Sequence, residues 1–210
     1  MHKDGSGPDA GHGARVKRLE LCLAFANTLH WHASNQPHET LHTYEDFLAW
    51  SEGQNLISRH GVAALTRRGR REPRAAAAVY SRATSLREAI YRVFVACIAR
   101  KAPADQDTRR LNEELQRAVA HYRIEFGTTT AAWCRAREAD ELDGPLWSIV
   151  QSAAELLLAE DLRERVGQCA DAGGCGWLFL DLSKNHSRRW CSMQDCGNRA
   201  KQHRLQARPK

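Results

Sequence analysis

The stretch that decides the fold runs from Cys169 to Arg204 and reads CADAGGCGWLFLDLSKNHSRRWCSMQDCGNRAKQHR. Its four cysteines are separated by five, fifteen and four residues, and the other three cysteines of the chain lie outside it. Two close thiol pairs joined by a short spacer are typical of a tetrahedral zinc site, because zinc prefers four soft ligands. The sequence therefore predicts one structural zinc ion on Cys169, Cys175, Cys191 and Cys196.

Other roles for these four cysteines are less favoured. Disulfides form in oxidising compartments, and the first residues of the chain lack the apolar centre of a secretory signal. We therefore expect a cytoplasmic protein with reduced thiols. A catalytic zinc needs an open coordination position, and four available thiols argue against one. A metal would also replace the core that a module of roughly forty residues cannot build alone.

We expect residues 166–210 to form a treble-clef-like zinc finger, which combines a loop, a β-hairpin and a ligand-bearing helix. Two glycines loosen the loop of the first thiol pair, and the fifteen-residue spacer is long enough for a hairpin. The pattern predicts a strand over Gly176–Asp181. It also predicts a basic helix over Gly197–Leu205, which Asp195 could cap at its positive N-terminal end.

Positive charge is concentrated at the carboxyl end. The chain has 31 Lys and Arg against 25 Asp and Glu, hence +6. From Leu182 to Lys210 there are eight basic residues and one acid, Asp195, which gives +7, whereas the remainder has 23 against 24, which gives −1. Four thiolates around a divalent zinc leave about −2 at the site, so the module stays positive. Such a surface favours a polyanion.

The expected polyanion is double-stranded DNA. Arginine can hold a phosphate or a guanine through two parallel hydrogen bonds. Each basic residue could alternatively be a solvated surface side chain, and Arg188 and Arg189 could pack on a tryptophan through cation–π contact. The candidate DNA-contacting residues are Lys184, Arg188, Arg189, Arg199, Lys201, Gln202 and Arg204.

The rest of the chain predicts a mainly α fold. A hydrophobic fraction of 42% suits a packed core, and no apolar run approaches the roughly 20 residues that span a bilayer. Residues 1–14 are predicted to be a flexible tail, and residues 15–165 a helical domain with a small β-hairpin. The expected helices cover residues 15–31, 43–50, part of 55–73, 74–100, 107–126 and 146–162, and the expected hairpin covers 128–137.

Polar residues interrupt an apolar stretch at Asn27 and Thr28. Polar groups inside a core need partners. The two side chains could line a small-molecule pocket beside Trp31, or they could make internal hydrogen bonds that hold helices together. The sequence shows no nucleophile–base pair and no glycine-rich phosphate loop, so we do not expect an enzyme.

The quoted residues also carry a resemblance. The segment Gly176–Arg204 resembles the CGNR zinc-finger family, named for the motif that stands here at residues 196–199. Three stretches, Leu21–Trp31, Leu86–Phe94 and Ser152–Cys169, are similar to the ABATE domain of bacterial, stress-linked transcription regulators. The resemblance implies zinc on the four cysteines and DNA binding by the finger. The family's first thiol pair more often has four intervening residues, where this chain has five.

Two classes of function follow. The leading interpretation is a DNA-binding transcription regulator with a structural zinc finger and an N-terminal domain that senses a ligand or dimerises. The alternative is a small-molecule-binding protein or enzyme whose zinc module serves assembly or protein contacts. A further alternative adds redox sensing, since oxidised thiolates would release zinc. The sequence leaves the oligomeric state open, although one short finger would gain specificity by forming a homodimer.

Overall fold

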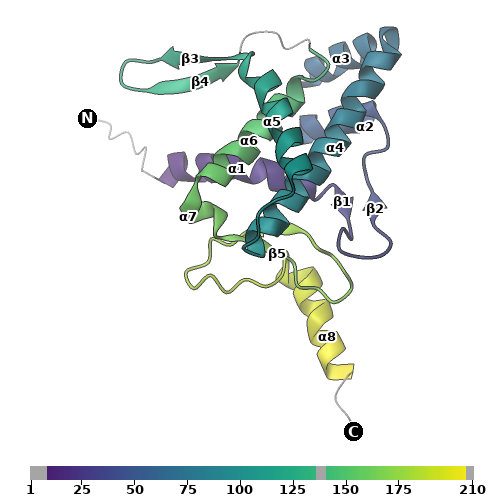
Figure 1. The fold of residues 1–210 in the computed structure, drawn as a ribbon, viewed down its shortest axis with the longest axis vertical. Coiled ribbons are helices and arrows are strands. Elements are labelled where there is room, and N and C mark those ends of the chain that lie inside the picture. Colours follow the sequence, from purple (N-terminus) through teal and green to yellow (C-terminus); the bar gives the residue numbers. More distant parts are fainter. Residues whose placement is uncertain (1–8, 136–140, 207–210) are drawn as a thin grey trace, which may run out of the picture.

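The computed structural model describes residues 9–135 and 141–206. Its helices confirm the predicted mainly α fold (Figure 1). They are α1 (Asp9–Ala26), α2 (Tyr44–Gly53), α3 (Arg59–Arg71), α4 (Pro73–Ile98), α5 (Asp105–Val119), α6 (Gly144–Leu158), α7 (Glu160–Arg163) and α8 (Asn198–Gln206), with a π-helical turn η1 (Met193–Gly197) before α8.

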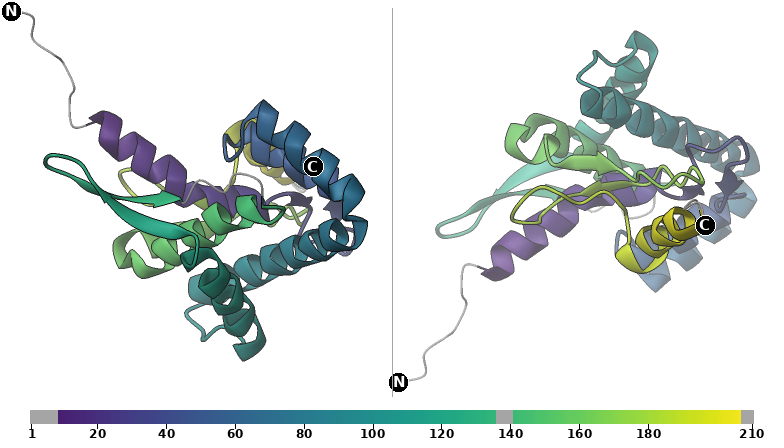
Figure 2. Two further views of the ribbon diagram at one scale, coloured as in Figure 1. Left: turned by 90° about the horizontal axis from the view of Figure 1, so that it is seen from above. Right: turned by 90° about the horizontal axis from the view of Figure 1, so that it is seen from below.

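Six short strands pair in three antiparallel two-stranded sheets within the described ranges. The first sheet joins β1 (Leu29–His30) to β2 (His38–Glu39). The second is the hairpin of β3 (Tyr122–Phe126) and β4 (Ala131–Arg135), which projects from the helices on the side of α1 (Figure 2). The third joins β5 (Val166–Gln168) to β6 (Leu178–Leu180).

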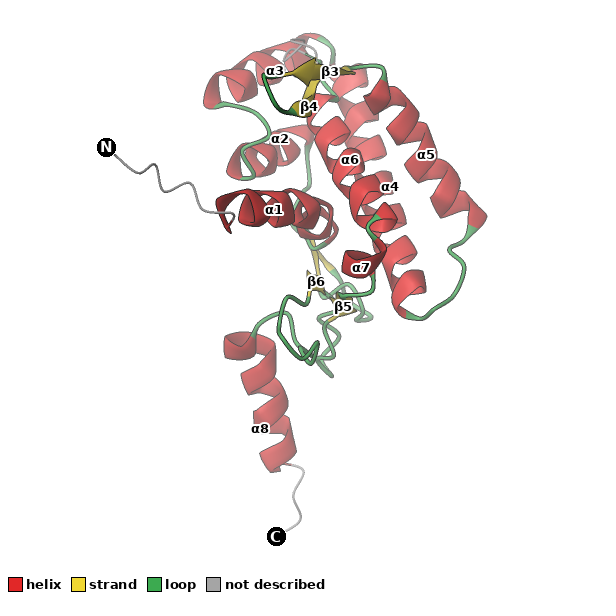
Figure 3. Cartoon of the chain, turned by 90° about the vertical axis from the view of Figure 1, so that its left-hand side faces the viewer, coloured by secondary structure: helices red, strands yellow, loops and turns green. Residues whose placement is uncertain are grey.

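The main core lies where α1, α4 and α6 meet (Figure 3). Helix α4 presents Leu86, Ile90 and Phe94 to this core, and all three are fully buried, as their four-residue spacing predicts. Helices α1 and α6 are joined by a hydrogen bond, in which the Cys22 N–H donates to Ser152 Oγ at 3.0 Å. This bundle forms the platform against which the carboxyl-terminal module packs.

Helix boundaries differ from the predictions at both ends of α1. The helix begins at Asp9, so residues 9–14 of the predicted tail are helical, because extending an existing helix costs less than starting one. It also ends at Ala26 rather than Trp31. Asn27 turns its amide toward another segment, and Trp31 has a left-handed φ of 56°, which a helix cannot accommodate.

The helix predicted over residues 107–126 ends at Val119, and Tyr122–Phe126 form strand β3. The sequence YRIEF alternates aromatic and β-branched residues with charged ones, and this period of two overrides the helical pattern. The hairpin predicted over 128–137 is therefore only the turn and second strand of a longer one; residues 136–137 lie outside the described residues. Helix α6 likewise ends at Leu158, and α7 follows as a separate turn.

The hairpin of the carboxyl-terminal module is not in the cysteine spacer, where we predicted it. Strand β6 pairs with β5, which precedes the first cysteine. Gly167 allows this pairing, because a Cβ there would lie 2.7 Å from the Phe179 ring. The described spacer residues after β6 form no second strand, since the exposed sequence SKNHSRR lacks apolar alternation. Thr43 caps α2. Ser192, and not the predicted Asp195, caps the turn η1 that leads into α8.

Candidate metal centre

The four cysteines of the carboxyl-terminal module converge on one point. Their Sγ atoms all lie within 4.8 Å of one another. The Sγ of Cys191 is 3.7 Å from that of Cys175 and 3.6 Å from that of Cys196. A tetrahedral zinc with bonds of about 2.3 Å needs sulfur atoms about 3.8 Å apart. The site therefore fits one zinc ion, and four thiolates leave no coordination position open.

Two loops bring the cysteines together. Cys169 directly follows β5, and its N–H donates to the carbonyl of Trp177 at 2.8 Å, which holds the first loop closed. Ala170 N–H donates to the carbonyl of Arg189 at 2.9 Å and ties this loop to the segment before Cys191. The last thiol lies in η1, whose first turn is capped by the Ser192 hydroxyl. The thiol positions are thus set by backbone hydrogen bonds as well as by the metal.

The first thiol loop is closed by a segment from the other end of the chain, the Trp31–Ser34 loop. Here the His32 N–H donates to the carbonyl of Cys175, and the Ala33 N–H to that of Gly174, both at 3.1 Å. Gly176 has a φ of 66°, and a Cβ on it would lie 2.7 Å from Ala33 N. Only glycine permits this close backbone approach. The zinc loop is therefore built partly from the N-terminal helical part.

Comparison with family models matches both parts of the chain. The ABATE model, described as a putative stress-induced transcription regulator, matches residues 19–160. The chain belongs to the ABATE family. The CGNR zinc finger model matches residues 165–209, so the four-cysteine site is the zinc site of a CGNR finger. Neither description is that of an enzyme.

No curated protein matches the chain. Across the described ranges, every helix is too short or too polar to cross a membrane.

The ABATE domain and the CGNR finger are joined by the side chain of Asn27. Its Nδ2 donates to the carbonyl of Leu178, and its Oδ1 accepts from the Leu178 N–H, both at 2.8 Å. The amide thus satisfies strand β6 on the side away from β5, as a neighbouring strand would. Thr28 donates to the carbonyl of Phe25 at 2.8 Å and accepts from Arg87 at 3.3 Å. Internal hydrogen bonds therefore account for both polar side chains.

Of the three residues proposed to bind a ligand, Asn27, Thr28 and Trp31, only Trp31 lines a cavity identified among the described residues. This cavity has a volume of about 230 Å³ and lies between the ABATE domain and the finger. Trp31 and His30 of the ABATE domain line it, as does Trp177 of the finger. Three of the four zinc ligands, Cys175, Cys191 and Cys196, also line it.

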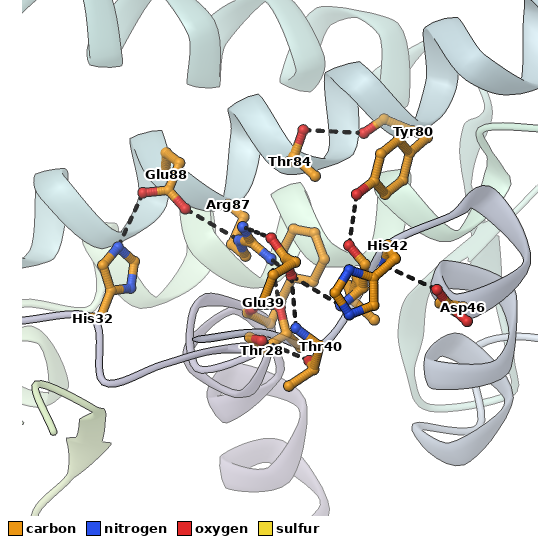
Figure 4. Close-up of polar contacts among 12 residues, drawn as sticks. Thr28, His32, Glu39, Thr40, His42, Asp46, Tyr80, Thr84, Arg87 and Glu88 are labelled. Carbon is orange, nitrogen blue, oxygen red and sulfur yellow. Dashed lines mark hydrogen bonds and ion pairs between the residues drawn. The ribbon is translucent and has the colours of Figure 1, made fainter. Parts of the chain in front are cut away.

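A buried ion-pair network, which the sequence did not reveal, holds the β1–β2 segment on α4 (Figure 4). The Arg87 side chain is only 4% exposed and donates to both carboxylate oxygens of Glu39, at 2.7 and 2.6 Å. Burial alone would raise the pKa of Glu39, but the hydrogen bonds and charge of Arg87 lower it below its ordinary value. Glu88 contacts both Arg87, at 3.2 Å, and His32, at 3.0 Å. The network thus fixes the loop that closes the zinc site.

Two of the seven candidate DNA-contacting residues point into the finger. The Arg188 guanidinium donates to the carbonyls of Trp190, at 3.0 Å, and Cys191, and lies 4.5 Å from the centre of the Phe179 ring. Arg199 donates to Asp171 and to a zinc ligand. Both arginines therefore have intramolecular partners.

The other five candidates, like Arg188, are exposed: Lys184, Arg189, Lys201, Gln202 and Arg204. Three of them lie on α8, which extends away from the ABATE domain (Figures 1 and 3). No residue of the described α8 is buried. Arg189 lies 5.5 Å from the centre of the Trp190 ring, and Arg204 donates to a carbonyl of its own helix. These five residues form the basic surface of the finger.

Proposed function

We propose that this ABATE protein is a transcription regulator that binds double-stranded DNA through the basic surface of its CGNR finger. The observation that carries the proposal is the exposure of α8. A helix of nine residues with no buried side chain is marginal in water. It gains stability when a partner covers it. Because the helix is strongly polar and basic, that partner is a polyanion rather than an apolar surface.

The chemistry of the exposed side chains supports DNA among polyanions. Lys184 and Arg189, which lie in the loop before the second thiol pair, suit phosphate contacts. Lys201 and Arg204 extend the same charge along α8. Gln202 lies between them in sequence and can form paired hydrogen bonds with an adenine edge. Arg188 and Arg199 are left out of the proposed contact set, because their guanidinium groups already have partners inside the finger.

The salt dependence of DNA binding tests this proposal. The basic surface carries four cations, and each phosphate contact contributes about −0.9 to the slope of log K against log salt. We therefore expect a slope of about −3 to −4 for random-sequence duplex DNA with the zinc-loaded chain. In the double variant Lys201→Gln/Arg204→Gln, the slope should become less steep by about 2. Salt-independent binding, or no binding, would refute the proposal.

A matched control removes the same charge elsewhere. Arg67 and Arg70 are exposed on α3 of the ABATE domain. The double variant Arg67→Gln/Arg70→Gln should keep the slope of the unmodified chain. If it lowers the slope as much as the α8 variant does, net charge rather than the basic surface governs binding.

The sensing part of the proposal concerns the cavity that Trp31 and Trp177 line. A small ligand bound there would contact the ABATE domain and the finger together, which is the arrangement a sensor needs. A thermal-shift screen of the zinc-loaded full chain tests it, since a ligand that binds the folded state raises the melting temperature. If Trp31→Ala leaves every positive shift unchanged, the ligands bind elsewhere. We also propose that the protein is bacterial, cytoplasmic and linked to stress, and that it forms a homodimer. Light scattering of the purified chain measures its oligomeric state.

A further inference from the structure

Arg199 belongs to the CGNR motif and is the second residue of α8, yet its side chain turns back toward the zinc site. Its Nε donates to Asp171 Oδ1 at 3.2 Å, and its Nη2 donates to Cys196 Sγ at 3.0 Å. The guanidinium carbon lies 4.8 Å from the centre of the Trp31 ring. One side chain therefore touches the first thiol loop, a zinc ligand of the second loop, and the ABATE domain.

Charge explains why a guanidinium occupies this place. The Asp171 side chain is only 1% exposed, and its Oδ2 has no hydrogen-bond partner in the described residues. Four thiolates on a divalent zinc add about −2 next to it. Two adjacent buried anionic groups are costly unless a cation compensates them. Arg199 supplies that cation with two donors in one plane, which a lysine ammonium cannot match.

The same contacts anchor the first turn of α8. The other side-chain hydrogen bonds of the described α8 are local, from Asn198 to the carbonyl of Gln194 and from Arg204 to that of Ala200. Arg199 is the α8 residue that forms hydrogen bonds and ring contacts with Asp171 and Trp31. The start of the helix is thereby held against both the zinc centre and the ABATE domain.

We propose that Arg199 is a positioning residue, which stabilises the zinc-bound thiolates and links them to α8 and Trp31, and that it does not contact DNA. Outer-shell partners of this kind typically change metal affinity by roughly ten- to hundredfold when removed. The inference rests on the proposed function only where it concerns the DNA-facing role of α8; the part about zinc stands without it.

The test measures zinc affinity by competition with a chromophoric chelator and, separately, the salt slope of DNA binding at saturating zinc. It uses the full chain and four proteins besides the unmodified one: Arg199→Gln, Arg199→Lys, Asp171→Asn/Arg199→Gln and the control Arg204→Gln. We expect Arg199→Gln to lower zinc affinity roughly ten- to hundredfold and to leave the salt slope unchanged. Arg199→Lys should lose less affinity. Arg204→Gln should keep the zinc affinity of the unmodified chain, and its salt slope should be less steep by about 0.9.

The double variant separates a specific contact from general damage. Asp171→Asn removes the carboxylate that Arg199 would otherwise leave unpaired, so it should recover part of the zinc affinity lost in Arg199→Gln. If Arg199→Gln alone fails to fold, the zinc affinity of the double variant still tests the proposal. If Arg199→Gln binds zinc as tightly as the unmodified chain, the proposal is overturned, regardless of the salt slope of DNA binding. Failure of every protein to bind DNA would refute the proposed function and leave the zinc measurements to decide the role of Arg199.

Discussion

Asn27 gives the sharpest prediction about how the two parts of the molecule hold together. In Asn27→Ala the N–H and the carbonyl of Leu178 lose their partners, and Leu178 is only 2% exposed. An unsatisfied buried backbone group costs about 1–3 kcal/mol. Because Asn27 itself is half-buried and water can reach part of the space, we expect the free energy of unfolding to fall by about 2–4 kcal/mol.

Urea denaturation in excess zinc measures this change, followed by far-ultraviolet circular dichroism. In thermal melts, the same change should lower Tm by about 4–16 °C for a chain of this size. The matched control is Asn185→Ala, because Asn185 is exposed in the spacer loop; its effect should stay within about 0.5 kcal/mol. If Asn27→Ala is as stable as that control, the bond between Asn27 and β6 does not hold the finger on the ABATE domain.

Three further predictions concern the same junction. Arg87→Met should destabilise the chain by about 2–4 kcal/mol in chemical denaturation, because it leaves partly buried carboxylates without their cation. An effect below about 1 kcal/mol would contradict the ion-pair role. Because the pKa of Glu39 is lowered in the folded state, its contribution is present above its ordinary value of 4.5 and is lost as the pH falls through the lowered value. The stability gap between Arg87→Met and the unmodified chain should therefore narrow below pH 4.5. Gly176→Ala should lower the free energy of unfolding by about 2 kcal/mol or more in chemical denaturation. Its control is Gly53→Ala, where a Cβ meets no atom within 4 Å, and that variant should be nearly as stable as the unmodified chain.

The metal ligands could be predicted from the sequence because thiol spacing is a local, covalent property. The same holds for α4, whose apolar residues recur at the helical period, and for the Thr43 cap of α2, where Asp46 completes a capping box. The β3 strand was missed because Tyr122–Phe126 follows a strong helical pattern without a proline or glycine to end it. Two competing periods overlap there, and only the pairing partner decides between them.

Long-range partners explain the other differences. Asn27 stood out in the sequence as a polar residue in an apolar stretch, but its partner, the backbone of Leu178, lies 151 residues away. Arg199 was predicted to contact DNA because basic residues surround it in the sequence. Its inward direction depends on Asp171, which is 28 residues earlier, and on the distant Trp31. The signal in the sequence that pointed to a cation at this place was an acid, Asp171, between the two cysteines of the first thiol pair.

Native mass spectrometry of the purified full chain, combined with hydrogen exchange before and after chelation, tests the central claim most directly. We predict one zinc ion per chain. Removal of that ion should expose the backbone amides of β5, β6 and the Trp31–Ser34 loop to rapid exchange, because the metal and these hydrogen bonds hold the same loops. A metal-free chain whose amides in these segments remain protected would contradict it.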